Sequence, residues 1–271
     1  MSVRGVMFRA LALVLVALFV GAVSAWAHPE DEFCVPGQSA LDPTLCEALA
    51  ALDSVEGGRS LSPEAESLLA DLENRSAVET FLLYVYIGFQ HILPMGLDHI
   101  LFVIGLVLST PRLRQLALQI SAFTIAHTAT LGLAATGMVD LPAEIVEPLI
   151  AASIAFVAIE AIFLREPPPW RLAVVFLFGL IHGLGFAGAF GELGLPATQF
   201  WPGLIGFNVG VEVGQITVAL AGLAALWAAS RIIKGPEKGY PNTAVWPAAI
   251  MVAATGAFWT IERVWSALSM V

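Results

Sequence analysis

Six long apolar segments are the feature that most constrains how this chain can fold. Their approximate spans are 81–108, 113–136, 143–164, 170–190, 203–230 and 244–265. Each is near the roughly 20 residues that an α-helix needs to cross a bilayer. Of the 271 residues, 58% are hydrophobic and 13% are charged, against roughly a quarter charged in soluble domains. The sequence therefore predicts an all-α integral membrane protein with six transmembrane helices and argues against an ordinary soluble enzyme.

The first 27 residues have the pattern of a cleavable signal peptide. Arg4 and Arg9 make a basic start, residues 10–23 are apolar but short for spanning, and Ala25-Trp26-Ala27 supplies small residues at a cleavage site. We expect cleavage after Ala27, with an uncleaved anchor as the alternative. Cleavage would place His28 first in the mature chain, where its amine and ring could chelate copper.

Residues 28–79 form an acidic segment ahead of the membrane domain, which we assign to residues 80–271. The segment holds 12 Asp and Glu residues against Arg59 and Arg75, so it carries the whole net charge of −10. We expect a small helical extracytoplasmic segment whose Cys34 and Cys46 form a disulfide; a cysteine metal site is the alternative. The acidity argues against nucleic acid as a partner, and a homo-oligomer stays open.

The loops predict the orientation of the six spans. Basic residues follow the first, third and fifth spans, namely Arg112, Arg114, Arg165, Arg171, Arg231, Lys234 and Lys238. The loops after the second and fourth spans hold only acidic charges, namely Asp140, Glu144, Glu147 and Glu192. We therefore expect a multi-pass protein of a bacterial inner (cell) membrane, with both mature termini on the extracytoplasmic side.

Polar side chains inside the spans indicate where function lies, because each is costly in a bilayer without a partner. They are His91, His99, His127, His182, Asp98, Glu160, Glu212, Asn208 and Gln215. No Lys or Arg lies in the middle of a span. We therefore expect the carboxylates to be protonated, paired with histidines or bound to a cation.

The first span carries the densest polar cluster, from Gln90 to His99. At 100° per residue, His91 and Asp98 share one helix face with His99 beside them. Pro94 and Gly96 predict a kink or break between them, which could turn free carbonyl groups towards an ion. A proline kink satisfied by neighbouring polar groups is the structural alternative.

Glycines and isolated polar residues mark the later spans. His182 lies among glycines that permit close helix approach, and Gly206, Gly210 and Gly214 form a packing stripe beside Asn208, Glu212 and Gln215. His127 is either a metal contact or an interhelical hydrogen bond, with neighbouring hydroxyls within reach of its ring. Glu160 either reaches the membrane surface or pairs with Arg165.

Three runs in this order resemble the HupE/UreJ family. They extend from His91 to Phe102, from Phe178 to Ala187 and from Phe207 to Gln215, within a resemblance that covers about residues 81–230. The six residues between His91 and Asp98 make the chain similar to the divergent second branch of the family. The resemblance implies a nickel or cobalt permease with a cleaved signal and six spans. It also implies a metal-handling motif of His91, Asp98 and His99, with His182 and Glu212 in the later motifs.

Imidazole and carboxylate ligands suit Ni, Co, Zn, Fe or Cu(II), so the chemistry agrees with a divalent transition metal ion. We predict a permease, not an enzyme, that binds the ion at His91, Asp98, His99, His127, His182 and Glu212. Asn208, Gln215 and Glu160 are expected to support these ligands. Two alternatives stay open: an integral-membrane zinc-dependent hydrolase, and a metal sensor or assembly factor that uses the acidic segment.

Overall fold

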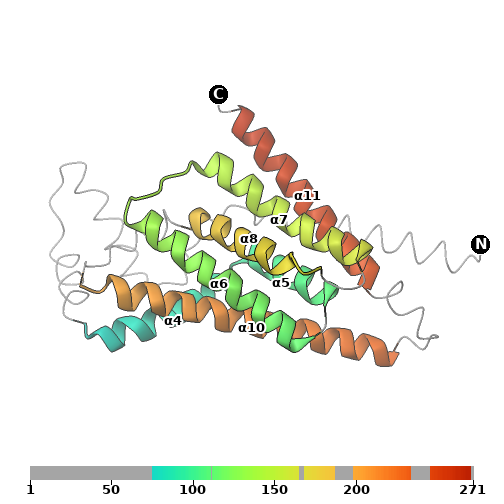
Figure 1. Cartoon of the computed structure of the whole chain (residues 1–271), viewed down its shortest axis with the longest axis horizontal. Helices are drawn as coiled ribbons and strands as arrows, with labels where there is room; N and C mark the ends of the chain where they lie inside the picture. Colours follow the sequence, from blue (N-terminus) through green and yellow to red (C-terminus); the bar gives the residue numbers. More distant parts are fainter. Residues whose placement is uncertain (1–74, 111, 165–167, 187–197, 233–244, 270–271) are drawn as a thin grey trace, which may run out of the picture.

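The computed structural model describes residues 75–110, 112–164, 168–186, 198–232 and 245–269. These residues form seven helices and no strand (Figure 1): α4 Ala77–Ile92, α5 Leu97–Ser109, α6 Leu113–Ala135, α7 Ala143–Phe163, α8 Arg171–Gly185, α10 Phe200–Ile232 and α11 Trp246–Ser269. The predicted all-helical class is confirmed. The signal peptide and almost all of the acidic segment, with Cys34 and Cys46, lie outside the described residues.

Several of these helices have the length and composition of membrane spans. Helices α6, α7 and the part of α10 over Phe200–Ala229 are long and apolar enough to cross a bilayer. The pair α4 and α5, bent by 72°, makes a fourth span if the two count as one. The shorter apolar α8 and the 24-residue α11 occupy the fourth and sixth predicted spans. The helices therefore lie where the sequence predicts them, and the count of six spans stays a prediction.

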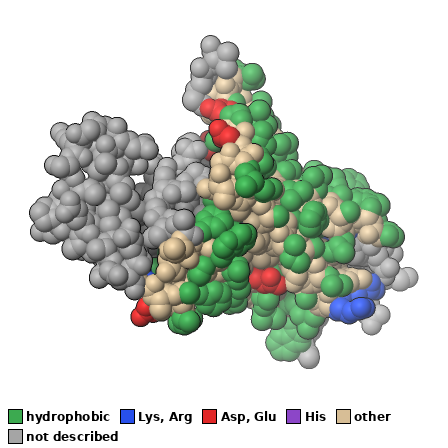
Figure 2. All heavy atoms as spheres, turned by 60° about the vertical axis from the view of Figure 1, so that its left-hand side comes forward, with side chains coloured by type: hydrophobic (Ala, Val, Ile, Leu, Met, Phe, Trp, Pro, Cys, Tyr) green, Lys and Arg blue, Asp and Glu red, His purple; other side chains and the backbone are tan. Residues whose placement is uncertain are grey.

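The outward faces of the helices are apolar. Figure 2 shows hydrophobic side chains spread over the described surface, with acidic and basic side chains in a few separate groups. Phe163, Trp201, Ile261, Trp265 and Leu268 are between 66% and 77% exposed. Large apolar side chains are rarely exposed in such numbers to water. Together with the apolar helices, they identify a multi-pass membrane protein.

The first predicted span is broken, as Pro94 and Gly96 predict. Helix α4 begins at a capping box in which Ser76 and Glu79 exchange hydrogen bonds, and it ends at Ile92. Pro94 has no N–H to continue the helix, and a Cβ at Gly96 would meet the carbonyl oxygen of His91. The prediction that His91 and Asp98 share a helix face is wrong, because the bend places Asp98 on a separate helix, α5.

Helix α4 lies beside α10 along much of the length of α4 (Figure 1). Glycines of α10 determine how closely the two helices approach. A Cβ at Gly206 would meet the carbonyl oxygen of Phe81, and one at Gly210 would meet that of Val85. Only glycine permits such an approach between two backbones. The predicted packing stripe on α10 is thereby confirmed.

A second close contact joins α8 to α6. A Cβ at Gly179 would meet the carbonyl oxygen of Phe123, and one at Gly183 would meet that of His127. Helix α5 packs chiefly on α7, and α11 also packs on α7. The close approach of α8 to α6 brings His182 and His127 into one region of the core.

Substituting Gly210 with alanine tests the role of this close packing. The added methyl group has backbone as its neighbour and cannot be absorbed by a side-chain rotation. We expect a loss of about 1–3 kcal/mol in stability, measured as a lower melting temperature of the purified protein in detergent. Gly222→Ala is the matched control on α10, because its nearest neighbour is a side-chain methyl of Val107 at 3.3 Å. Equal melting temperatures for the two variants would contradict this account.

Candidate metal centre

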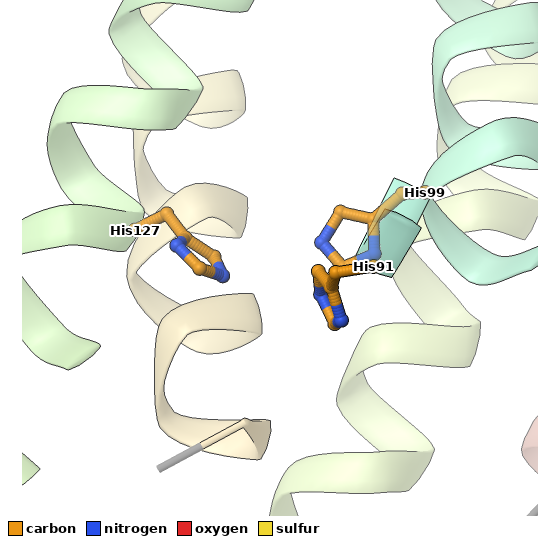
Figure 3. A group of neighbouring side chains, drawn as sticks. All are labelled: His91, His99 and His127. Carbon is orange, nitrogen blue, oxygen red and sulfur yellow. The ribbon is translucent and has the colours of Figure 1, made fainter. Parts of the chain in front are cut away.

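Three histidines from three helices meet in the core. His91 lies at the end of α4, His99 in the first turn of α5 and His127 in α6, and they are 7%, 6% and 0% exposed. One ligand nitrogen from each lies within 4.8 Å of the others. Figure 3 shows the His127 ring across a common space from the rings of His91 and His99.

The spacing of these nitrogens is close to that of a bound metal ion. Nitrogens about 2.1 Å from a tetrahedral ion lie about 3.4 Å from one another. The three rings therefore need to draw in by no more than about 1.4 Å from their present 4.8 Å limit. Small side-chain rotations supply a movement of this size.

A fourth histidine borders this group. His182 on α8 is 1% exposed, and its ring centroid is 4.9 Å from that of His99. Its Nε2 lies 2.9 Å from the hydroxyl of Ser153, which donates its own proton to the carbonyl of Ile150. Because a serine hydroxyl has one proton, Nε2–H of His182 donates to Ser153. The lone pair then lies on Nδ1, which is buried and has no hydrogen-bond partner among the described residues.

Asn208 fixes the protonation of His127 in the same way. Nδ1 of His127 lies 2.9 Å from Oδ1 of Asn208, and Nδ2 of Asn208 donates to the carbonyl of Leu204. Since an amide oxygen only accepts, Nδ1 of His127 carries the proton. Its Nε2 presents a lone pair, the arrangement that a metal-binding imidazole needs. The ring is held by this amide, while the hydroxyls of Thr124 and Thr128 donate to backbone carbonyls of their own helix.

Phenylalanines surround the imidazoles. The centroid of the His91 ring is 4.2 Å from Phe186 and 5.4 Å from Phe207, and that of His182 is 5.0 Å from Phe123 and 5.4 Å from Phe102. Within the described part of the chain, Nε2 of His99 and Nε2 of His127 are buried and have no hydrogen-bond partner. A buried polar atom without a partner is costly. A cation at the centre of these rings would remove that cost.

Asp98 lies beside this group but turns to a different partner. Its Oδ2 accepts a hydrogen bond from Nη1 of Arg263 on α11 at 3.1 Å. The same Nη1 donates to the carbonyl of Glu147, and Nε of Arg263 lies 3.9 Å from the carboxylate of Glu147. The sequence led us to expect protonation, a histidine or a bound cation for the membrane carboxylates, and it did not predict the arginine that pairs with Asp98. Arg263 belongs to the predicted outer end of the last span, and the packing of α11 on α7 brings it to α5.

Glu160, which was expected either to reach the membrane surface or to pair with Arg165, has a different arginine as its partner. It forms a buried ion pair with Arg171, the first residue of α8, and the two residues are 6% and 2% exposed. Arg165, the partner proposed from the sequence, lies outside the described residues. The ion pair joins the last turn of α7 to the first residue of α8, and Glu160 is not in the group of ligand atoms that the described residues bring together.

Glu212 and Gln215 on α10 contact α6 outside the histidine group. Ser121 donates a hydrogen bond to Oε1 of Glu212 at 2.6 Å, and the hydroxyl of Thr124 lies 3.3 Å from Oε1 of Gln215. With the bond between His127 and Asn208, these make three polar contacts along one helix interface. Glu212 is half-buried, and neither side chain joins the cluster of histidine nitrogens.

Three partners that the structure assigns were absent from the sequence predictions. The sequence gives only a weak indication that Ser153 has a role. An isolated serine in an apolar span is nevertheless a polar group that needs a partner. Arg171 and Arg263 lie near helix ends, where basic residues ordinarily reach water. Arg171 is buried against the preceding helix, 11 positions from Glu160, and Arg263 is buried against α5, 165 positions from Asp98, so only the packing of the helices shows both contacts.

The fold and the centre define an all-helical membrane protein with a buried imidazole cluster of the kind that binds a metal ion. A family model described as HupE / UreJ protein matches residues 68–263, well over half of the chain. The chain belongs to the HupE/UreJ family, which is associated with nickel and cobalt transport. Neither a search of curated proteins nor a search of solved structures found a match.

Replacing Asn208 by leucine tests the link between Asn208 and His127. The variant leaves Nδ1–H of His127 without its acceptor, so the ring loses its fixed tautomer and orientation. We expect the affinity for Co²⁺ to fall by about 10-fold to 100-fold, measured by visible absorption of the purified protein. Thr217→Val is the control on the same helix, because that hydroxyl donates only to the carbonyl of Val213. An unchanged affinity in Asn208→Leu would refute the assignment.

Proposed function

We propose that this protein is a permease for a divalent transition metal ion, with nickel or cobalt as the favoured substrate. The observation that carries the proposal is the approach of His91, His99 and His127 ligand nitrogens to within 4.8 Å inside an apolar core. Three neutral imidazoles suit borderline ions such as Ni²⁺ and Co²⁺, and also Zn²⁺, Fe²⁺ and Cu²⁺. The family association favours the first two of these.

Polar side chains lie on two sides of the histidine group. This arrangement favours transport of the ion rather than permanent binding of a metal cofactor. On one side, Asp98 lies next to His99 in sequence and contacts Arg263, which also contacts Glu147 near the start of α7. On the other side, Asn208, Gln215 and Glu212 follow the interface of α6 and α10. A transported ion needs sites that bind it well enough to replace its water and weakly enough to release it.

We assign to His182 and Glu212 the binding of the ion immediately before or after it occupies the three-histidine centre. His182 offers a buried lone pair on Nδ1, and its ring is 4.9 Å from that of His99. Glu212 supplies a carboxylate along α10, in contact with Ser121. An ion that leaves the imidazoles along this interface therefore meets an anionic oxygen ligand.

The acidic segment, residues 28–79, is assigned to capture of the cation outside the membrane. Its charge of −10 would raise the local concentration of divalent ions. The signal peptide, the disulfide between Cys34 and Cys46, the six spans and the extracytoplasmic termini belong to the same proposal. In this scheme the protein lies in a bacterial cell membrane and takes the ion from the outer side.

Uptake into proteoliposomes tests the permease directly. We expect the wild-type protein to accumulate Ni²⁺ or Co²⁺ above empty liposomes, and His99→Ala to reduce uptake at least about 10-fold, as expected for loss of a metal ligand. Tyr86→Phe is the control, since this side chain on α4 is 56% exposed and loses only its hydroxyl.

Parallel assays with Zn²⁺, Fe²⁺ and Cu²⁺ identify the preferred ion. Uptake of every metal at the rate of empty liposomes would reject transport. Metal-dependent hydrolysis by the same preparation would then favour the zinc hydrolase.

Deletion of residues 28–74, with the signal peptide and the α4 capping box of Ser76 and Glu79 kept, tests the capture role. We expect uptake to fall at low metal concentration and to approach the wild-type rate at high concentration, because only the local supply of ions changes. The measurement is the concentration dependence of initial uptake, with membrane insertion checked by protease protection. Complete loss of uptake at every concentration in a correctly inserted protein would contradict a role limited to capture.

A further inference from the structure

Arg263 is a buried arginine that joins three helices. It lies on α11, is 7% exposed, and donates through Nη1 both to Oδ2 of Asp98 and to the carbonyl of Glu147, each at 3.1 Å. Its Nε lies 3.9 Å from the Glu147 carboxylate, and its guanidinium carbon lies 5.6 Å from the Trp259 ring centroid. One side chain therefore connects α11 to the start of α5 and to α7.

The start of α5 has little local support of its own. Its N-cap residue is Gly96, which has no side chain to accept a hydrogen bond from the first turn. The preceding residues bend the chain by 72°, so α4 does not fix the direction in which α5 begins. Asp98 and His99 both lie in this first turn. The position of His99 must therefore depend on what holds the first turn from outside.

Asp98 and His99 face different partners because adjacent residues in a helix point about 100° apart. Asp98 faces Arg263, and His99 faces the other histidines. The Asp98 side chain is 20% exposed and that of Arg263 is 7% exposed, so the pair is partly desolvated. Removing one member would leave the other charge poorly compensated, which makes this contact stronger than a surface ion pair.

We propose that Arg263 is a positioning residue of the metal centre, which acts through Asp98 to hold His99 in place. Through its contact with Asp98, Arg263 of α11 fixes the first turn of α5. Asp98 is then a residue that orients this turn and is not a ligand of the ion. The guanidinium suits this role because its fixed fork of donors reaches two acceptors on two helices at once. The inference rests on the proposed function only in taking the three histidines as a metal site.

Co²⁺ titration of the full-length protein in detergent tests this role, because the visible bands of Co²⁺ report both affinity and coordination geometry. The variants are Arg263→Gln, Arg263→Lys, Asp98→Asn and the double variant Asp98→Asn/Arg263→Gln. Glu262→Gln is the control, since it removes a charge from the neighbouring position of α11. Melting temperatures are recorded without metal for every variant.

We expect Arg263→Gln and Asp98→Asn each to weaken Co²⁺ binding by about 10-fold to 100-fold with the same change in the visible bands. The double variant should bind no more weakly than either single variant, because the two residues act as one unit. Arg263→Lys should bind Co²⁺ more tightly than Arg263→Gln but less tightly than the wild type. Glu262→Gln should bind as the wild type does. The double variant removes both charges of the Asp98–Arg263 pair and leaves only Glu147, whose side chain is 23% exposed, so it keeps the test informative if Arg263→Gln does not fold.

Two results would overturn the assignment. In the first, Arg263→Gln binds Co²⁺ as tightly as the wild type. In the second, Asp98→Asn weakens binding far more than Arg263→Gln does, and the two losses multiply in the double variant; Asp98 would then be a ligand. A wild-type protein that binds no Co²⁺ would instead reject the metal centre itself, so failure of the proposed function is distinct from failure of this inference.

Discussion

The break in the first apolar segment is the constraint on which the metal centre depends. A continuous helix would carry His91 and His99 eight positions apart, more than two turns along its axis. The interruption at Pro94 and Gly96 brings their ring centroids to 4.9 Å. The histidines at the two new helix ends then meet His127 and His182 from α6 and α8. Glycines matter for the same reason, since Gly179 and Gly183 allow α8 to lie directly against α6.

His127 and His182 each combine one interhelical hydrogen bond with a second ring nitrogen that has no partner among the described residues. A histidine that serves only to join helices would use both ring nitrogens or turn one to water. His127 instead donates to Asn208 with one nitrogen and has the other buried among phenylalanines, and His182 does the same with Ser153. Each supporting contact fixes a tautomer with its lone pair buried. A buried lone pair without a partner costs free energy, and a cation or a hydrogen-bond donor would remove that cost.

The sequence predicted the features that depend on local chemistry. Apolar length placed the helices, proline and glycine placed the break, and the cost of polar groups in a bilayer selected all four histidines. The sequence did not predict the contacts that depend on which helices pack against each other. Asp98 pairs with Arg263 across 165 positions and Glu160 pairs with Arg171, and no periodicity in the chain encodes either contact. The shared face of His91 and Asp98 failed because helical periodicity does not continue through a 72° bend.

The glycine contacts also bear on how such a centre could let go of an ion. Helices whose backbones touch have little room to slide, so α4 with α10, and α6 with α8, form two stiff pairs. His91 belongs to the first pair, and His127 and His182 belong to the second. The two pairs meet at the interface of α6 and α10, where three polar side-chain contacts cross between them. A shift of about one ångström across it changes ligand distances enough to loosen an ion, while every helix keeps its internal hydrogen bonds.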